Sequence, residues 1–314
     1  MAEADNMIHT EEIGCVQNRN MAAGGENSSI TVEEEFRKNP ELKKQDLDEL
    51  RDWMKSQAHL PKISDEQLIL FLHSCYFKVE PTKKTIEVCY TIRTQTPELF
   101  GNMDPLSDDV QHAWKLVQIT KLPEPDPEGR ALVFGRLRDT DPHHFNFCNM
   151  LKLNHILTWS MLRDGGTNAG YVFIYDIAGF TLTHLSRIPL STLKKHLTYV
   201  QEGYPLRMKG VHIINVPTYV DKIMTVIKPF LKKDIMKMVR FHTGRTDTLY
   251  TYVPRELLPK DYGGDQKSVE ELCQAMKERV EACREWYLQE QTLKATGGKR
   301  RSSLVPDFRR LNID

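Results

Sequence analysis

Residues 202–217 read Glu-Gly-Tyr-Pro-Leu-Arg-Met-Lys-Gly-Val-His-Ile-Ile-Asn-Val-Pro. The glycine and proline near the beginning of this stretch are typical of a turn. The apolar, β-branched run Val211–Val216 is short enough for a buried strand. Asn215 and Pro217 end the run, because proline has no N–H to donate to a strand ladder. The stretch therefore predicts a basic turn that leads into a core strand.

An amphipathic helix is predicted directly after this strand, over Val216–Leu231. Its apolar residues recur every three or four positions, which is the spacing of one helical face. They are Val216, Tyr219, Val220, Ile223, Met224, Ile227, Phe230 and Leu231. This face is broader than packing on a core requires. It includes the large side chains of Tyr219, Met224 and Phe230.

Strands and helices alternate in this half of the chain. The other predicted strands are Ala131–Leu137, Gly170–Ile177 and Met238–His242, and the predicted helices are Phe147–Leu162 and Thr192–Val200. The second of these strands is nearly all apolar, which is typical of a strand covered on both faces. The alternation indicates an α/β fold in which helices cover a sheet.

Composition and pattern divide the chain into five segments. We expect a disordered leader at 1–30, a helical bundle at 31–96, a proline-rich connector at 97–127, the α/β domain at 128–266, and a C-terminal helix with a basic tail at 267–314. Within the bundle, Ser64 and Gln67 have the spacing of a helix capping box. In the tail, Ser302 and Ser303 follow two arginines and weakly match a kinase site.

The composition excludes several classes of protein. The chain has 314 residues and a formal net charge of +0, which gives no general attraction to nucleic acid. No apolar run approaches the roughly 20 residues that span a bilayer. The acidic start of the chain is unlike a secretory signal. The 6 cysteines are scattered without a CxxC pair, so we expect reduced thiols and a cytoplasmic protein that attaches to membranes only transiently.

Motifs for catalysis are nearly absent. The sequence has no phosphate-binding glycine loop, no GxSxG elbow and no HExxH pair, and it predicts no metal and no cofactor. Asp176 ends a predicted core strand, where α/β enzymes place catalytic carboxylates, but it also suits a turn cap. An isomerase or hydrolase that uses Asp176 with His196 or His212 is therefore one alternative to a binding protein that is not an enzyme.

Several short motifs occur in a fixed order between Leu47 and Gly264. They are Phe71-Leu72 with Phe77, Asp176–Phe180, Glu202–Pro205, Asn215–Pro217, Lys228–Leu231, and Leu258-Pro259 with Tyr262–Gly264. Together they resemble the CRAL-TRIO (Sec14-like) lipid-binding family, close to its tocopherol-transfer and retinaldehyde-binding branch. The resemblance implies an N-terminal helical bundle, then an α/β domain whose sheet is the floor of an apolar cavity beneath a movable lid helix.

The resemblance also implies a ligand and the residues that hold it. The ligand would be one hydrophobic molecule, such as a tocopherol, a retinoid or a carotenoid, which the protein would transfer between membranes. The family's cavity positions fall on Met150, Leu153, Leu157, Tyr171, Tyr175, Phe180, His196, Tyr199, Val200, Leu206, Met208 and Val211, and the lid adds Tyr219, Val220, Ile223 and Ile227. His196 and the tyrosine hydroxyls are suited to orient one polar head group.

Basic residues near the lid form a second candidate site. In the related branch a basic cleft holds a phosphoinositide head group, and Arg207 and Lys209 match two of its positions. Other positions of that cleft fall on Cys75, Asp234 and Met238, and the nearby basic residues are Lys233, Lys237 and Arg240. We expect attraction to anionic membranes and to phosphoinositides here. A phosphoinositide-responsive adaptor or lipid sensor is the alternative to a carrier.

Overall fold

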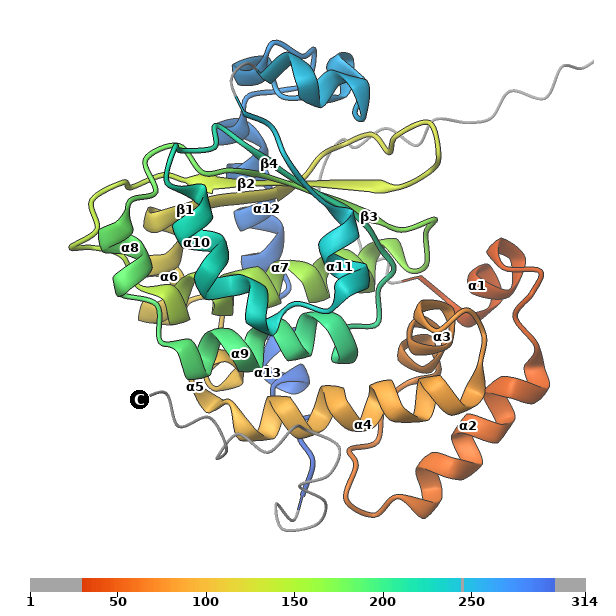
Figure 1. Ribbon diagram of the computed structural model, residues 1–314. Coiled ribbons are helices and arrows are strands. Elements are labelled where there is room, and N and C mark those ends of the chain that lie inside the picture. The colour runs from red at the N-terminus through yellow and green to blue at the C-terminus, as the bar shows by residue number, and fades with distance from the viewer. Residues whose placement is uncertain (1–29, 244–245, 297–314) are drawn as a thin grey trace, which may run out of the picture.

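The computed structural model describes residues 30–243 and 246–296 (Figure 1). The expected leader, apart from Ile30, and the basic tail with Ser302 and Ser303 lie outside the described residues. Among the described residues, no helix is both long enough and apolar enough to cross a membrane.

The first part of the structure is helical, as the sequence predicts. Its helices are α1 (Val32–Lys38), α2 (Lys44–Ser56), α3 (Asp65–Ser74) and α4 (Val79–Gln95), which lie below the sheet in Figure 1. The predicted capping box at the start of α3 is present. The backbone N–H of Gln67 donates to Ser64 Oγ at 3.3 Å, and the Gln67 side chain accepts from the Ser64 N–H at 3.1 Å.

The expected connector at 97–127 is instead structured. It contains α5 (Pro97–Phe100), α6 (Asp108–Leu116) and the strand β1 (Val117–Lys121). Two of the five residues of β1 are polar yet buried, so the apolar pattern gave a weak signal. The Gln118 amide donates to Glu270 at 2.8 Å and accepts from Arg136 at 2.7 Å. These hydrogen bonds offset the cost of burying the amide.

The core of the second part is a sheet with the order β1-β2-β3-β4-β5. β2 (Ala131–Leu137), β3 (Tyr171–Asp176), β4 (Met208–Ile214) and β5 (Val239–Phe241) are parallel, and β1 is antiparallel to β2. β4 begins three residues before the predicted run, because Met208 already pairs with Tyr171. It ends at Ile214, because Asn215 has a positive φ of 52°.

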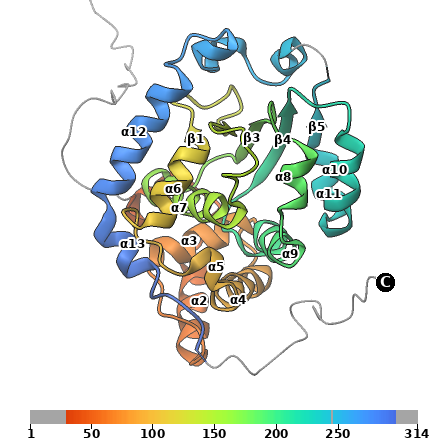
Figure 2. The same ribbon diagram turned by 90° about the vertical axis from the view of Figure 1, so that its left-hand side faces the viewer.

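The two faces of the sheet pack against different elements, since successive residues of a strand point to opposite sides. On β3, the rings of Tyr171, Phe173 and Tyr175 are stacked on one side, with centroids 6.4 and 6.1 Å apart. Val172 and Ile174 point to the other side, into an apolar cluster that includes residues of α12 (Val269–Ala282). Figure 2 shows α12 beside β1, and α10 and α11 beside β5.

Most of the remaining helices cover the face of the sheet that carries the tyrosine rings, and the others lie toward the C-terminal end of the chain. They are α7 (Phe147–Gly165), α8 (Leu182–Ser186), α9 (Leu190–Thr198), a π-helix (Tyr199–Gly203), α10 (Val220–Ile227), a 3-10 turn (Lys228–Phe230), α11 (Lys233–Met238), 3-10 turns at Thr246–Thr251, Arg255–Leu257 and Lys260–Tyr262, and α13 (Arg284–Glu290). The helix predicted from Val216 begins at Val220, because Pro217 starts a turn whose carbonyl accepts from the Val220 N–H at 3.1 Å.

Buried charged side chains connect the N-terminal helices to the rest of the structure through hydrogen bonds. Arg93 on α4 donates to the Glu290 carboxylate at 2.7 Å and to its carbonyl at 2.9 Å. Glu35 on α1 accepts from the backbone N–H of Thr167 at 2.9 Å. The π-helix also approaches α4 closely, since a Cβ on Gly203 would lie 3.1 Å from the Cα of Cys89. These contacts fix the bundle against the wall of the cavity described next.

Candidate functional site

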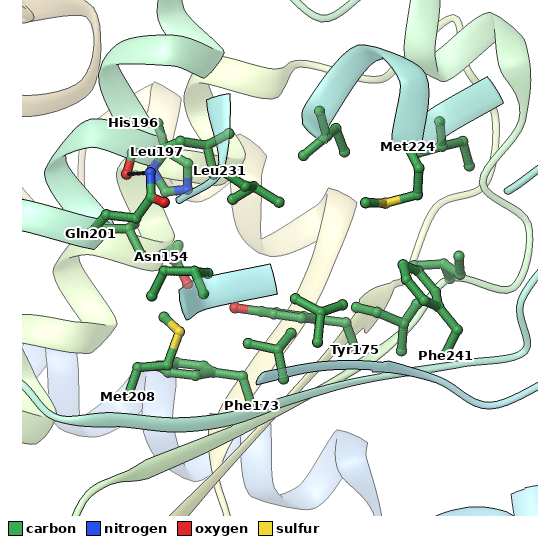
Figure 3. A pocket seen from close by; sticks show the side chains of 18 of the residues that line it. Asn154, Phe173, Tyr175, His196, Leu197, Gln201, Met208, Met224, Leu231 and Phe241 are labelled. Atoms are coloured by element: carbon green, nitrogen blue, oxygen red, sulfur yellow. Dashed lines mark hydrogen bonds between the residues drawn. The ribbon is translucent and has the colours of Figure 1, made fainter. Parts of the chain in front are cut away.

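A cavity of about 290 Å³ lies between the sheet and the helices α7, α9, α10 and α11 (Figure 3). This volume is near the lower end of the range typical of small-molecule sites, which is roughly 300–1,000 Å³. None of the described side chains that line the cavity is Asp, Glu, Lys or Arg. The cavity is therefore suited to an apolar, uncharged molecule.

The floor of the cavity is the tyrosine side of the sheet. Alternate residues of three neighbouring strands contribute to it, namely Phe173, Tyr175 and Ile177 from β3 and the residue after it, Val211 and Ile213 from β4, and Val239 and Phe241 from β5. Tyr175 is accommodated by its partner on β2, since a Cβ on Gly135 would lie 3.1 Å from its ring. Glycine at 135 thus leaves room for the tyrosine ring.

The roof is α10 with the turn that follows it. Val220, Ile223, Met224 and Ile227 line the cavity at the helical spacing that the sequence predicts, and Leu231 and Ile235 extend this surface. Ile223 is buried, whereas Asp221, Lys222 and Thr225 on the outer face are exposed. Before α10, the hydroxyl of Tyr219 donates to the carbonyl of Phe180. The helix α10 therefore supplies four lining residues and keeps its polar face toward solvent.

The structure brings nine of the sequence-predicted residues to the cavity. They are Tyr175, His196, Val200, Leu206, Met208, Val211, Val220, Ile223 and Ile227. These residues come from β3, β4, α9, the π-helix, α10 and the turn before β4, and so from segments that are far apart in the sequence.

Seven predicted residues do not line the cavity. They are Met150, Leu153, Leu157, Tyr171, Phe180, Tyr199 and Tyr219. On α7 the predicted residues Leu153 and Leu157 are buried in the core. The next residue in each case, Asn154 and Thr158, lines the cavity instead. A shift of one residue turns a helical side chain by about 100°, since there are 3.6 residues per turn. Tyr171 is on the correct side of β3 but beyond the end of the cavity.

Although Met224 and Leu231 lie on the predicted apolar helical face, thirteen lining residues are outside the predicted set of cavity residues. They are Asn154, Thr158, Phe173, Ile177, Leu197, Gln201, Tyr204, Ile213, Met224, Leu231, Ile235, Val239 and Phe241. A signal existed for Phe173, which lies between two predicted tyrosines in a strand of period two, and for Met224 on the predicted apolar face of the helix. Asn154 and Thr158 had no such signal, because polar side chains on a helix usually face solvent.

The polar groups gather at one end of the cavity. In Figure 3, Asn154, His196 and Gln201 lie toward one end, the hydroxyl of Tyr175 points toward them, and Met224 and Phe241 lie at the other end. Burial lowers the pKa of His196 to about 4 and raises the pKa of Tyr175 to about 12. Both groups are therefore uncharged near neutral pH. The cavity thus has one polar, neutral end and one apolar end.

The histidine and aspartate considered for catalysis do not form a pair with each other. Asp176 accepts from the Tyr262 hydroxyl at 2.6 Å and from the Ala178 N–H at 2.8 Å, which makes it a turn cap. It lies on the α12 side of the sheet, whereas His196 lines the cavity on the other side. Among the described residues, no group of three potential metal ligands occurs.

His212 also points away from the cavity. Its Nδ1 is 2.9 Å from Nε2 of His242, whose own Nδ1 is 2.9 Å from the Thr248 hydroxyl. Burial and the neighbouring His242 and Arg240 lower the pKa of His212 to about 4. The ring is thus held by another histidine and not by a carboxylate, as a general base in a catalytic dyad would be.

Arg207 and Lys209 both contact one aromatic ring. The Arg207 guanidinium lies 4.2 Å from the ring centroid of Tyr76, and Lys209 Nζ donates to the Tyr76 hydroxyl at 3.1 Å. Arg207 Nε also donates to the His73 carbonyl at 2.7 Å, and its Nη2 is buried without a partner among the described residues. Tyr76 is 57% exposed. The ring thus packs on the half-buried Arg207 guanidinium, whereas Lys209 is exposed beside it.

The other predicted basic residues are exposed. Lys237 pairs with Asp234 at 2.8 Å, and the Arg240 guanidinium lies 4.8 Å from the ring centroid of Tyr252. Lys233 begins α11, which contacts β4. Asp234 is exposed and neutralises Lys237, which lies one turn further along α11.

Comparisons with known proteins agree with this architecture. The CRAL/TRIO domain family matches residues 117–264, and the family described as Pinta-like, UBA domain matches residues 39–110. The human protein called Alpha-tocopherol transfer protein-like is 29% identical over 238 residues, which are 74% of this chain and 68% of that protein. Rat Clavesin-2 is 24% identical over 233 residues, covering 73% and 71% respectively. The crystal structure of Sfh5 aligns with a TM-score of 0.49 at 16% identity over 79% of this chain and 96% of that one.

The CRAL/TRIO match begins at β1 and ends just after the last 3-10 turn, so it includes the whole sheet and the roof helix α10. Residues 117–264 therefore form a CRAL/TRIO domain, which follows the N-terminal helices.

Proposed function

We propose that this chain binds one hydrophobic molecule in the cavity and carries it between membranes, without catalysing a reaction. The main support is the apolar cavity of about 290 Å³ beneath α10, to which the roof helix turns its apolar face. The name of the human relative includes tocopherol transfer. A tocopherol, a retinoid or a carotenoid is the kind of ligand that fits this description.

The energy of burial is sufficient for such a ligand. An isoprenoid that buries roughly 400 Å² of apolar surface gains on the order of 10 kcal/mol at about 25 cal/mol per Å². The loss of translational and rotational freedom offsets part of this gain. Tight binding is thus expected without a charged anchor, in agreement with the uncharged lining of the cavity.

In this proposal α10 acts as a lid. Opening it would uncover the side chains of Ile223, Met224 and Ile227, which now face the cavity. In water this exposure is unfavourable, but at a membrane the same face can insert between head groups. The membrane would therefore favour the open state by its differential affinity. We propose peripheral, transient attachment of a cytoplasmic protein on this basis.

The basic pair Arg207 and Lys209 supports a contact with anionic head groups beside the cavity. A buried guanidinium nitrogen without a partner is a costly feature that an anion would relieve. The anionic head group that we propose most specifically is that of a phosphoinositide. An adaptor that senses such lipids is the second candidate function.

A matched pair of substitutions on α10 tests the carrier. Ile223→Asp places a charge inside the closed cavity, whereas Thr225→Asp places the same charge on the exposed face of the same helix. We expect purified Ile223→Asp to lose co-purifying lipid in native mass spectrometry and to lose transfer between vesicles, and Thr225→Asp to keep both. A folded Ile223→Asp protein that retains lipid as well as the wild type would refute the proposal.

A further inference from the structure

A single peptide group joins the beginning of the roof to the helix α8. The carbonyl of Phe180 accepts a hydrogen bond from the hydroxyl of Tyr219, the residue before α10. The N–H of the same peptide group, which belongs to Thr181, donates to Nδ1 of His184 at 3.0 Å. Figures 1 and 2 show α8 beside α10. His184 and Tyr219 therefore hold the two sides of one rigid peptide plane.

The hydrogen bond to Thr181 fixes the protonation of the His184 ring. Thr181 is the N-cap of α8, and His184 is the third residue of the helix, where a capping box normally has glutamate or glutamine. Because Nδ1 of His184 accepts from a backbone N–H, this nitrogen carries no proton. The proton of the neutral ring is thus on Nε2, which is buried without a hydrogen-bond partner among the described residues. A second proton, bound at Nδ1, would remove the acceptor from the cap.

The ring of His184 lies in an apolar site that suits only its neutral form. The residue is fully buried. Its ring packs against those of Phe145 and Phe180, with centroids 5.1 and 5.3 Å away. Burial penalises the charged form of a histidine, and it accordingly lowers the pKa of His184. Protonation therefore favours movement of the ring out of this aromatic contact.

The charged and titratable groups around His184 come from the loop before α7 and from the end of α8. They are Asp139, Asp141, His143, His144 and Arg187. The two carboxylates oppose the effect of burial on the pKa of His184, and the Arg187 guanidinium adds to it. Asp139 is already 2.8 Å from Nδ1 of His144. Asp141 is therefore the counter-charge that we assign to a protonated His184.

We infer that His184 is a proton-sensitive latch for the roof. Neutral His184 holds the peptide group between Phe180 and Thr181 in the orientation that Tyr219 binds. Protonated His184 releases this group, so the beginning of α10 is freed in weak acid. Protons, like other cations, concentrate at the surface of an anionic membrane, so the latch would respond where the ligand is exchanged. This inference rests on the proposed function, because it names a regulation of the same roof.

The first test measures how fast the full-length protein releases the fluorescent hydrocarbon diphenylhexatriene at about pH 7.5 and pH 5.5. A released His184 regains its ordinary pKa of about 6.5 and binds a proton that the latched ring does not bind. About one pH unit below this value, the released state is therefore favoured about 10-fold. We expect release to be about 10-fold faster at the lower pH. The folded-state pKa of His196 and of His212 is about 4, so these rings stay mostly neutral in both buffers.

Three variants make the test specific to the latch. His184→Gln keeps a capping acceptor that does not titrate, so release should be slow at both pH values. Tyr219→Phe removes the hydroxyl that binds the peptide group, so release should be fast at both. His59→Gln, an identical change at an exposed site on the N-terminal bundle, should behave as the wild type. Circular dichroism would confirm that each variant is folded, and Tyr219→Phe decides the question if His184→Gln is not.

A second measurement needs no ligand and separates this inference from the carrier proposal. Hydrogen–deuterium exchange of residues 219–227, corrected for the intrinsic effect of pH, should be faster at pH 5.5 in the wild type but not in His184→Gln. If the wild type shows no response to acid, or if His184→Gln keeps the response, the inference is overturned while a hydrophobic ligand still stands. If diphenylhexatriene does not bind, the carrier proposal fails, and the exchange result alone decides for or against the latch.

Discussion

Gln201 on the π-helix accepts a hydrogen bond from the backbone N–H of Lys232 at 2.7 Å. Its amide nitrogen donates to the carbonyl of Phe230 at 3.0 Å, and the neighbouring Glu202 pairs with the Lys232 ammonium at 3.0 Å. The end of the roof is therefore tied to the cavity wall by one side chain on each of two successive residues. The beginning of the roof is tied separately, by Tyr219 to Phe180.

The first prediction concerns this attachment. Gln201→Leu removes both hydrogen bonds to the roof, each with a net value of about 0.5–1.5 kcal/mol. We expect ligand to leave the cavity about 10-fold faster, with little change in the helical content. Stopped-flow displacement of a fluorescent lipid measures the rate. Gln274→Leu, on the exposed face of α12, is the matched control, and equal rates for the two variants would contradict a role of Gln201 in closure.

The second prediction concerns the basic pair beneath Tyr76. Tyr76→Asn removes the aromatic ring and, because asparagine tolerates the positive φ of 54° at this position, keeps the backbone. We expect stronger sedimentation with anionic vesicles, since the half-buried Arg207 becomes accessible beside Lys209, which is already exposed. Lys209→Ala should weaken it, and the difference should shrink at high salt. Lys55→Ala changes the net charge equally on a distant, exposed face, so an equal effect of the two alanine variants would exclude a specific role for Lys209.

The third prediction is a loss of stability in mild acid. Burial lowers the pKa of His196 and of His212 to about 4, below the value of 6.5 for an unfolded chain. Above pH 6.5 the rings are neutral in both states. Between pH 6.5 and 4 the unfolded chain binds protons that the folded chain does not, so the free energy of unfolding falls as the pH falls. We expect about 2 kcal/mol from each ring between pH 7 and 5.

Urea unfolding at the two pH values checks this expectation. His196→Gln and His212→Gln should each reduce the difference between pH 7 and pH 5, because glutamine does not titrate. His143→Gln, at an exposed site, should not reduce it. A wild type whose stability is the same at both pH values would contradict the depressed pKa values.

The fourth prediction concerns the ion pair that joins α4 to α13. Arg93 and Glu290 are 3% and 7% exposed, and Arg93 also packs against the rings of Tyr90 and Trp159 at 5.4 and 5.3 Å. Glu290→Gln leaves the buried guanidinium without a counter-charge, and we expect a loss of about 3–5 kcal/mol in unfolding free energy. Asp52→Asn breaks a fully exposed pair with Lys55 and should have almost no effect. Similar losses for both variants would show that burial does not matter here.

The fold was largely predictable because its signals are local. The run at Val211 and the period of the following helix predicted β4 and α10 to within a few residues. β1 was missed, since its buried Gln118 and Thr120 look like exposed residues until their partners on other elements are known. The break at Cys283 between α12 and α13 also has no local signal, because neither proline nor glycine marks it.

The candidate site was predictable where a strand or a broad helical face sets the direction of side chains. Ile223 is an example, since it follows from the helical period, whereas Tyr175 was assigned by the family resemblance and lies on the side of β3 that faces the cavity. The wall was harder, because the choice between Leu153 and Asn154 on α7 depends on how that helix is rotated against the sheet. Rotation is set by packing between distant segments, which a single sequence does not contain.

The alternation along β3 and β4 separates the residues that line the cavity from the residues that pack beneath the sheet. Phe173 and Val211 meet the cavity, whereas their neighbours Val172 and His212 belong to the opposite layer. A change of side-chain size at Phe173 or Val211 can lengthen or shorten the cavity without repacking the layer that contains Val172 and His212. Such a sheet lets the shape of a cavity vary while the framework that supports it stays the same.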